Sequence, residues 1–164
     1  MILSTPRLDL RELTDADLPA LRATLHDPVA MTAYEGAFDD AESLAWLRRM
    51  QQRYADDGFG LWAVVLRETG AMIGQCGITR QQVERDEVIE VGYLFERAHW
   101  YRGYAVEAAS ACRDWAFDTL PIDDLYAKVR STNVASMNVA IRLGMTVRRT
   151  FTTRDETGWA EASD

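Results

Sequence analysis

The stretch from position 99 to position 108 reads His99-Trp100-Tyr101-Arg102-Gly103-Tyr104-Ala105-Val106-Glu107-Ala108. Before it, residues 87–95 alternate between two faces of a predicted strand, one formed by Val88, Glu90, Gly92 and Leu94 and the other by Ile89, Val91, Tyr93 and Phe95. After it, apolar residues recur at helical spacing, at Ala105, Ala108, Ala109, Cys112, Trp115 and Ala116. The sequence therefore predicts a strand, a tight turn at Gly103 and a helix.

The predicted turn has the features of an anion-binding site. The first backbone N–H groups of a helix have no intrahelical partner and point outward with the positive end of the helix dipole, where phosphate commonly binds. Gly103 lets the backbone approach such a ligand, and Arg102 adds a positive charge. A single glycine also serves plain structural turns, so both interpretations stay open. The stretch is neither a P-loop nor a G-x-G-x-x-G dinucleotide fingerprint.

The first half of the chain predicts a strand, two helices and a hairpin. Residues 7–13 alternate as a half-buried strand, and a helix capped by Thr14 follows and ends at Asp27-Pro28. A loop over residues 30–38 precedes a second helix that starts after Asp39-Asp40 and runs to Gly58. The aromatic residues of this loop are explained by packing or by recognition. Residues 61–66 and 72–78 predict a hairpin, and residues 87–95 extend it to a three-stranded meander.

The second half predicts a short strand over residues 125–129 and an asparagine-rich helix over residues 133–143. Asn133 is a good helix cap and Gly144 a good helix end, whereas Asn138 is a poor helix former that is usually a solvated surface residue. Residues 147–153 predict another strand and residues 154–158 a turn. Residues 159–164 are short, polar and poor in β-branched side chains, so we expect the final strand to be absent or only two to three residues long, about half a normal strand.

Two motifs resemble one protein family. Trp100-Tyr101-Arg102-Gly103-Tyr104-Ala105 is similar to the pyrophosphate-binding turn of the GCN5-related N-acetyltransferases (GNAT), and residues 133–145, NVASMNVAIRLGM, are similar to the helix on their coenzyme A side, as in the RimJ/RimL-like subgroup. The resemblance covers the chain from Thr5 to Met145, with Tyr101 standing where the subgroup often has glycine. It implies one α/β (α+β) domain over residues 1–164, with a mixed, mostly antiparallel sheet flanked by helices and a splayed central strand pair that holds coenzyme A.

The resemblance also implies a set of site residues. Those that would bind acetyl-CoA, the co-substrate, are Tyr93, Leu94, Phe95, Arg102, Gly103, Tyr104, Ala105, Asn133 and Asn138. Glu90, a lone carboxylate among apolar neighbours on a predicted strand, is the candidate general base, although pairing with a cation or exposure to solvent explains it equally well. Ser136 is the candidate donor of a proton to the departing thiolate, and a local helix cap is the alternative. The sequence contains no metal-binding pattern.

The implied function is acetyl-CoA-dependent N-acetyltransfer to a primary amine, either a protein N-terminus or a small amine, by direct attack on the thioester. The alternatives are an acetyltransferase that modifies an antibiotic or an amino acid, and a catalytically inactive sensor that binds coenzyme A. In the resembled family, the helix–loop–helix that contains the loop over residues 30–38 forms one wall of the acceptor site.

The composition of the chain limits which partners and which cellular compartment are expected. A net charge of −8 argues against nucleic acid, and no apolar run is long enough for a membrane span. Cys76 and Cys112 lie in apolar patterns without C-x-x-C spacing, which favours core thiols in a reducing cytoplasm. A missing final strand would expose a sheet edge, so a homodimer that covers it is expected.

Overall fold

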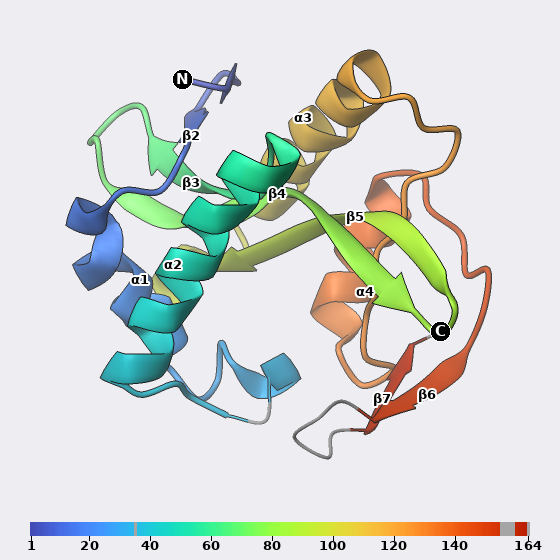
Figure 1. Ribbon diagram of the computed structural model, residues 1–164. Helices are drawn as coiled ribbons and strands as arrows, with labels where there is room; N and C mark the ends of the chain where they lie inside the picture. Colours follow the sequence, from blue (N-terminus) through green and yellow to red (C-terminus); the bar gives the residue numbers. More distant parts are fainter. Residues whose placement is uncertain (35, 155–159, 164) are drawn as a thin grey trace.

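The computed structural model describes residues 1–34, 36–154 and 160–163. Its main sheet has five antiparallel strands in sequence order (Figure 1). These strands are β1 (Leu3–Ser4), β2 (Leu8–Arg11), β3 (Leu61–Leu66), β4 (Met72–Val83) and β5 (Asp86–Phe95). The predicted meander of three strands is therefore confirmed, and β4 is longer than its apolar run because it pairs with β5 as far as Val83.

Helices cover both faces of this sheet. Helices α1 (Leu18–Leu25) and α2 (Asp40–Asp57) lie on one face, and α3 (Tyr104–Thr119) lies on the other (Figure 1). Helix α4 (Val134–Arg142) follows α3 and packs beside the end of the sheet. Three short 3₁₀ turns, η1 (Asp15–Asp17), η2 (Thr32–Tyr34) and η3 (Arg97–His99), complete the connections.

Helix α2 begins at its predicted cap, whereas α1 begins later than predicted: Thr14 caps the 3₁₀ turn η1, and Asp17 is the N-cap of α1. The Thr14 N–H donates to Asp17 Oδ2 at 2.8 Å, and Asp39 Oδ1 accepts from the N–H of Glu42 at 2.8 Å. Such contacts satisfy backbone donors that have no intrahelical partner. Gly58 ends α2 with a φ of +80°, a left-handed conformation that glycine adopts without steric cost.

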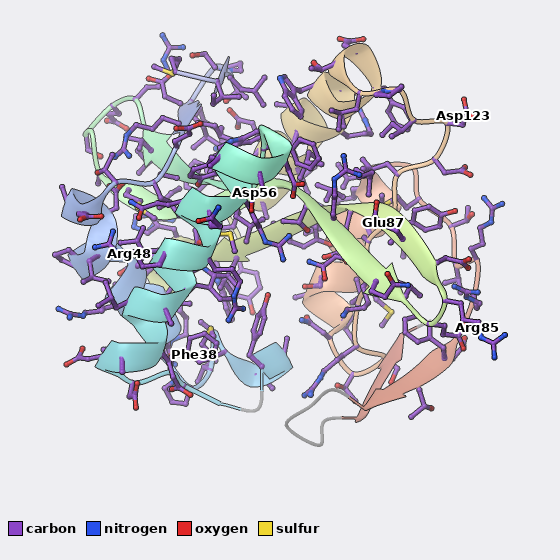
Figure 2. The ribbon with its side chains drawn as sticks, viewed as in Figure 1. Phe38, Arg48, Asp56, Arg85, Glu87 and Asp123 are labelled. Atoms are coloured by element: carbon purple, nitrogen blue, oxygen red, sulfur yellow. The ribbon has the colours of Figure 1, made fainter. Side chains whose placement is uncertain are left out.

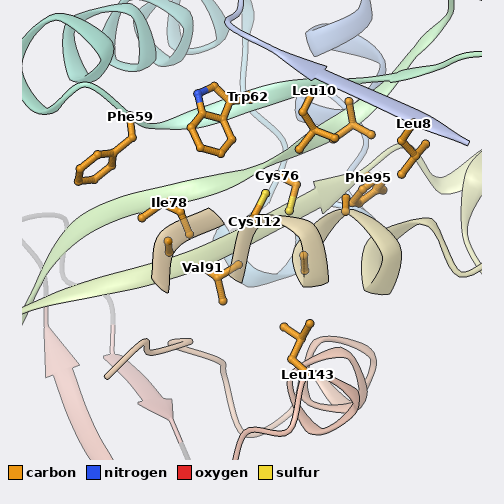
Figure 3. Close-up of a cluster of buried hydrophobic side chains, with 14 of the residues drawn as sticks. Leu8, Leu10, Phe59, Trp62, Cys76, Ile78, Val91, Phe95, Cys112 and Leu143 are labelled. Atoms are coloured by element: carbon orange, nitrogen blue, oxygen red, sulfur yellow. The ribbon is translucent and has the colours of Figure 1, made fainter. Parts of the chain in front are cut away.

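The larger hydrophobic core lies between the sheet and α3. Figure 3 shows Cys76 of β4 and Cys112 of α3 side by side in this cluster, and both side chains are fully buried as free thiols. Burial raises the pKa of the Cys112 thiol, and its neighbour Cys76 adds to the rise. The interpretation of both cysteines as core residues is confirmed.

The second core lies between the sheet and helices α1 and α2. The aromatic residues of the α1–α2 loop pack into it: the ring centroids of Tyr34 and Trp46 are 5.7 Å apart, and those of Phe38 and Trp46 are 5.9 Å apart, both edge to face. Figure 2 shows Phe38 beside the first turns of α2. Packing therefore explains these loop aromatics, as one of the two interpretations proposed.

The predicted strand over residues 125–129 is not a strand. Within the described residues, Tyr126 pairs with β5 through an isolated parallel bridge to Glu90. The prediction of a short strand is therefore wrong. An alternating pattern indicates an extended chain with one buried face, but it does not supply a partner for a longer ladder.

The prediction for the C-terminal strands is also wrong in part. Strand β6 spans Phe151–Arg154 and starts later than expected, whereas β7 spans Ala160–Ser163 and is four residues long. The two strands pair with each other in a separate two-stranded sheet. Antiparallel pairing supplies backbone partners even to residues of low strand propensity, which explains a β7 longer than composition suggests. The predicted turn falls mostly on residues 155–159, outside the described part of the chain.

Candidate active site

The outer edge of β5 borders a gap. Strand β5 meets the following extended segment at one point, where the Val91 N–H donates to the Tyr126 C=O and the Tyr126 N–H donates to the Ile89 C=O, both at 2.9 Å. Within the described residues this ladder goes no further along β5. The edge after Val91 is therefore open to a different partner.

Tyr93 presents its backbone to this gap. Because hydrogen bonding alternates along a strand, residues in phase with Ile89 and Val91 turn their N–H and C=O groups away from β4. Tyr93 and Phe95 are the next residues in this phase, and the Phe95 C=O already accepts from Trp100 Nε1 at 2.9 Å. A bound molecule that contains amides can pair with Tyr93 as an added strand would.

Leu94 is arranged differently from its two neighbours. Its backbone faces β4, since a Cβ on Gly74 would lie 2.6 Å from the Leu94 carbonyl oxygen. Its side chain packs in the cluster under α1 and α2. Of the three predicted strand residues, Tyr93 and Phe95 therefore direct backbone groups to the gap, and Leu94 supplies a side chain to the opposite face.

The start of α4 closes the other side of the gap. Asn133 caps this helix, and its Oδ1 accepts from the Ser136 N–H at 3.1 Å. The Ser136 C=O accepts a hydrogen bond of 2.6 Å from the phenol of Tyr93. Burial raises the pKa of this phenol well above its ordinary value, so it remains a donor. The structure thus brings Ser136 and Asn133 next to β5.

Asn138 occupies an exposed position on the same helix. It lies in helical register with Val134 and Ile141, whose exposed fractions are 60% and 64%. An exposed apolar pair beside a polar amide is consistent with a surface that a ligand covers, and also with the solvated surface residue considered from sequence. Its role stays a prediction.

The turn before α3 has two residues in the left-handed region. Tyr101 has a φ of +62° and Gly103, the N-cap of α3, a φ of +79°. A Cβ on Gly103 would meet only Arg7 Nη2 at 3.5 Å, so the backbone conformation rather than lack of space requires glycine. Arg102 and Gly103 are exposed, whereas Tyr104 and Ala105 are half-buried. The first N–H groups of a helix of 16 residues are thus available at the surface.

Glu90 lies where the gap begins. Its backbone belongs to the bridge with Tyr126, and its half-buried side chain shares the α2 face of the sheet with the Gly92 position, whose Cβ would lie 3.9 Å from Glu90 Oε1. The negative charges of Asp57 and Glu90 act to raise the pKa of Arg53, although burial lowers it overall. A carboxylate in partly buried surroundings near a cation fits either role that the sequence suggested, base or ion-pair partner.

A groove of about 730 Å³ extends from Glu90 along the segment that carries Tyr126. It is bounded by the β4–β5 hairpin, the end of α3, helix α4 and the chain that leads to β6. Apolar side chains line much of it, and carboxylates including Glu87 and Asp123 border it (Figure 2). Cationic side chains line the same groove, namely Arg113, Lys128, Arg148 and Arg149. Arg148 pairs with Asp124 at 3.4 Å.

Two residues that border the turn, Arg7 and Glu107, were not predicted as site residues from the sequence. Arg7 of the β1–β2 connection donates to the Arg102 C=O at 3.0 Å and forms an ion pair of 2.6 Å with Glu107, in the first turn of α3. The only signal was that Arg7 and Glu107 both fall within the stretches that resemble the acetyltransferase family. Their separation of 100 residues gave no reason to connect them.

In residues 1–34, 36–154 and 160–163, no three side chains of His, Cys, Asp or Glu form a group that could hold a metal ion. In the same residues, no helix has both the length and the apolar character that crossing a membrane requires.

Comparison with known proteins gives consistent matches. A family model described as an acetyltransferase (GNAT) domain matches residues 7–146. The uncharacterized protein YkkB of Bacillus subtilis is 39% identical over 150 residues, which cover 91% of this chain and 87% of YkkB. The uncharacterized N-acetyltransferase YoaA of Bacillus subtilis is 30% identical over 87% of this chain and 81% of its own length. The crystal structure of an acetyltransferase from Agrobacterium tumefaciens is 36% identical, with a TM-score of 0.77 over 93% of this chain and 84% of that protein.

Proposed function

This chain belongs to the acetyltransferase (GNAT) family, and we propose that it transfers the acetyl group of acetyl-CoA to a primary amine by direct attack on the thioester. The observation that carries this proposal is the path along β5. A ligand paired with the open edge at Tyr93 runs toward the end of the strand at Phe95, and the phosphate-binding geometry at Gly103 follows directly in the chain.

The pantetheine arm of acetyl-CoA fits the gap because it contains amides. The Tyr93 C=O accepts from an amide N–H of this arm, and the Phe95 N–H donates to an amide C=O. Asn133, the N-cap of α4, and Asn138 on α4 bind the adjacent atoms. The pyrophosphate binds to the N–H groups of residues 102–105, with Arg102 as counter-charge.

The same strand supports the chemical step. A backbone N–H at Tyr93 that faces the thioester oxygen stabilises the negative charge that develops there during attack. Glu90 accepts a proton from the ammonium of the acceptor through a water molecule, which leaves a neutral amine as nucleophile. The nitrogen then bonds to the carbonyl carbon and releases its second proton to solvent, and the carbon–sulfur bond breaks. The hydroxyl of Ser136 donates a proton to the departing thiolate and recovers one from solvent.

Solved structures with this fold illustrate the range of acceptors. RimL, a ribosomal L7/L12 alpha-N-protein acetyltransferase, has been solved with coenzyme A and is 16% identical, with a TM-score of 0.74. Spermidine N-acetyltransferase from Vibrio cholerae, solved with coenzyme A and spermine, is 15% identical with a TM-score of 0.74. At this identity the likeness supports the fold alone. We propose a RimJ/RimL-like enzyme whose acceptor is a primary amine, either a protein N-terminus or a small molecule.

Release of free coenzyme A thiol tests this function directly. The protein is mixed with acetyl-CoA and an amine panel of N-terminal peptides, polyamines, aminoglycosides and amino acids. Thiol release that depends on one amine class supports the proposal and identifies the acceptor. Binding of coenzyme A without turnover across the whole panel would instead favour a sensor.

We also propose that the chain forms a homodimer. In the described residues, β6 and β7 pair with each other rather than with the main sheet, and a second copy of the chain covers the edge that they leave. Exposed edges are seldom left bare in stable proteins. Light scattering at micromolar concentration should give the mass of a dimer, and the mass of a monomer would contradict the proposal.

A further inference from the structure

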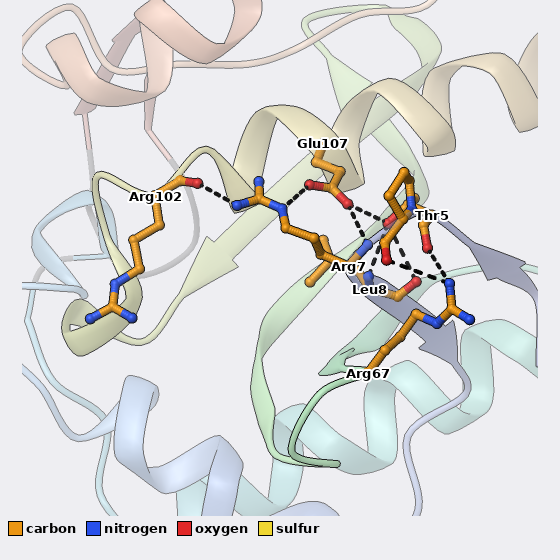
Figure 4. Close-up of polar contacts among 7 residues, drawn as sticks. Thr5, Arg7, Leu8, Arg67, Arg102 and Glu107 are labelled. Atoms are coloured by element: carbon orange, nitrogen blue, oxygen red, sulfur yellow. Dashed lines mark hydrogen bonds and ion pairs between the residues drawn. The ribbon is translucent and has the colours of Figure 1, made fainter.

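The connection between β1 and β2 contacts the first turn of α3, about 100 residues later in the chain. The carboxylate of Glu107 receives three hydrogen bonds from this connection (Figure 4). Its Oε1 accepts from the Thr5 hydroxyl at 2.6 Å and from the Arg7 N–H at 3.0 Å, and its Oε2 accepts from Arg7 Nε at 2.6 Å. The N-terminal segment is therefore fixed to the helix that begins at the predicted phosphate site.

The same arginine also holds the turn itself. Arg7 Nη1 donates to the C=O of Arg102 at 3.0 Å, and its guanidinium lies 4.5 Å from the ring centroid of Tyr104. One side chain thus contacts the residues on both sides of Gly103 as well as Glu107 in the helix. Figure 4 shows it lying between Arg102 and Glu107.

The contacts of Arg7 influence anion binding because they help to fix the backbone conformation of the turn. Left-handed residues on either side of Arg102 are typical of turns in which successive N–H groups point to one side. The left-handed conformation of Tyr101 is unfavourable for a residue with a Cβ, so neighbouring contacts must maintain it. By binding the Arg102 carbonyl, Arg7 directs that negative end of the peptide dipole away from the open side of the turn.

The negative charge of Glu107 provides a second link between Arg7 and anion binding. The Glu107 carboxylate lies in the first turn of α3, one turn from the N–H groups that would bind a phosphate. A negative charge there repels an anion, and the effect is strongest at short range. Arg7 cancels this charge by an ion pair of 2.6 Å between its Nε and Glu107 Oε2, and its backbone N–H also donates to Glu107 Oε1.

We propose that Arg7 is a positioning residue for the pyrophosphate of acetyl-CoA: it orients the Arg102–Gly103 turn and neutralises Glu107 beside it, without touching the reacting atoms. The inference rests on the proposed binding of acetyl-CoA at this turn. We therefore expect that loss of Arg7 weakens the binding of ligands that carry phosphates and leaves the affinity for ligands without phosphates unchanged.

The test compares Arg7→Gln with a matched control. Arg67 is also tied to the N-terminal connection, with Nη1 donating to the Thr5 C=O at 3.0 Å, and its side chain is 51% exposed against 47% for Arg7. It does not contact the turn in any of its described interactions (Figure 4). In calorimetric titration, the dissociation constant for coenzyme A should rise about tenfold in Arg7→Gln, as expected for loss of a charge-assisted contact. In Arg67→Gln it should rise by about twofold or less.

Two further measurements separate positioning from folding. Acetyl-pantetheine, which lacks the phosphates, should bind wild type and Arg7→Gln within about twofold in a displacement assay. The double variant Arg7→Gln/Glu107→Gln should recover coenzyme A affinity to within about threefold of wild type, because no carboxylate is left uncompensated. Arg7→Lys keeps the positive charge but loses the forked donor geometry of the guanidinium. Its affinity for coenzyme A should therefore lie between those of wild type and Arg7→Gln.

The outcomes distinguish this inference from the proposed function. Equal coenzyme A affinities for Arg7→Gln and Arg67→Gln would overturn the role of Arg7 alone. So would an equal loss for acetyl-pantetheine and coenzyme A, which would indicate a general loss of structure. A wild-type protein that does not bind coenzyme A would contradict the proposed function itself. If Arg7→Gln does not fold, the Arg7→Lys and Glu107→Gln variants carry the same comparison.

Discussion

The phenol of Tyr93 donates a hydrogen bond of 2.6 Å to the backbone carbonyl of Ser136, and so joins the middle of β5 to the first turn of α4. The two residues are 43 positions apart in the chain. Because the two elements lie on opposite sides of the proposed thioester site, this single contact sets the width of the gap between them.

Replacing Tyr93 with Phe removes that contact and keeps the ring. We expect the KM for acetyl-CoA to rise about fivefold, since a hydrogen bond of this kind contributes on the order of 1 kcal/mol. Tyr54→Phe is the matched control, because Tyr54 is also a partly buried tyrosine, and its phenol donates to the Leu61 carbonyl away from the gap. Steady-state kinetics in which both variants changed KM equally would contradict a local role for Tyr93.

Gly103→Ala should weaken coenzyme A binding about tenfold, because a side chain at a φ of +79° strains the turn and shifts its N–H groups. Gly58→Ala is the control: its φ is +80°, a Cβ there would meet nothing within 4 Å, and it lies at the end of α2. Both variants should lose about 1 kcal/mol of unfolding free energy. Calorimetry that finds normal affinity in Gly103→Ala would refute the placement of the pyrophosphate.

Glu90→Gln should lower kcat by roughly two to four orders of magnitude, the usual contribution of a general base, and leave coenzyme A affinity nearly unchanged. Glu68→Gln provides the comparison, since Glu68 is an exposed carboxylate in the turn between β3 and β4 and does not line the groove. Near-normal turnover of Glu90→Gln at neutral pH would leave only the ion-pair interpretation of this residue.

Acid should remove a stabilising contact at the start of α1. Burial acts to raise the pKa of Asp17, but hydrogen bonds from Arg11 and Thr14 outweigh it and lower the pKa below its ordinary value. A depressed folded-state pKa means that the stabilisation is complete above the unfolded pKa of about 4 and is lost as pH falls through the lower folded value. Denaturant unfolding should therefore show Asp17→Asn less stable than wild type at pH 7, with the difference shrinking below about pH 4. A difference independent of pH would exclude this linkage.

Local patterns predicted most of the fold because their causes are local. The alternation of β5, the buried stripe of α3 from Ala108 to Ala116, and the cap at Asp39 each depend on residues within one or two turns. The family resemblance then supplied the arrangement of these elements, which periodicity alone does not contain.

Contacts between distant segments could not be predicted in the same way. An acidic residue is common in the first turn of a helix, so nothing local to Glu107 indicated that Arg7 would bind it. The region around Tyr126 has the composition of a strand, but local sequence does not indicate that it forms a single bridge to β5. Composition likewise made the final segment too polar for a strand, although pairing with β6 gives it four strand residues.

A crystal structure of the protein with acetyl-CoA tests the central claim most directly. We predict that pyrophosphate oxygens lie within about 3.2 Å of the backbone nitrogens at residues 103–105 and that an amide of the pantetheine arm pairs with the backbone of Tyr93. A cofactor bound elsewhere, or one that reaches the turn without passing between β5 and α4, would contradict it.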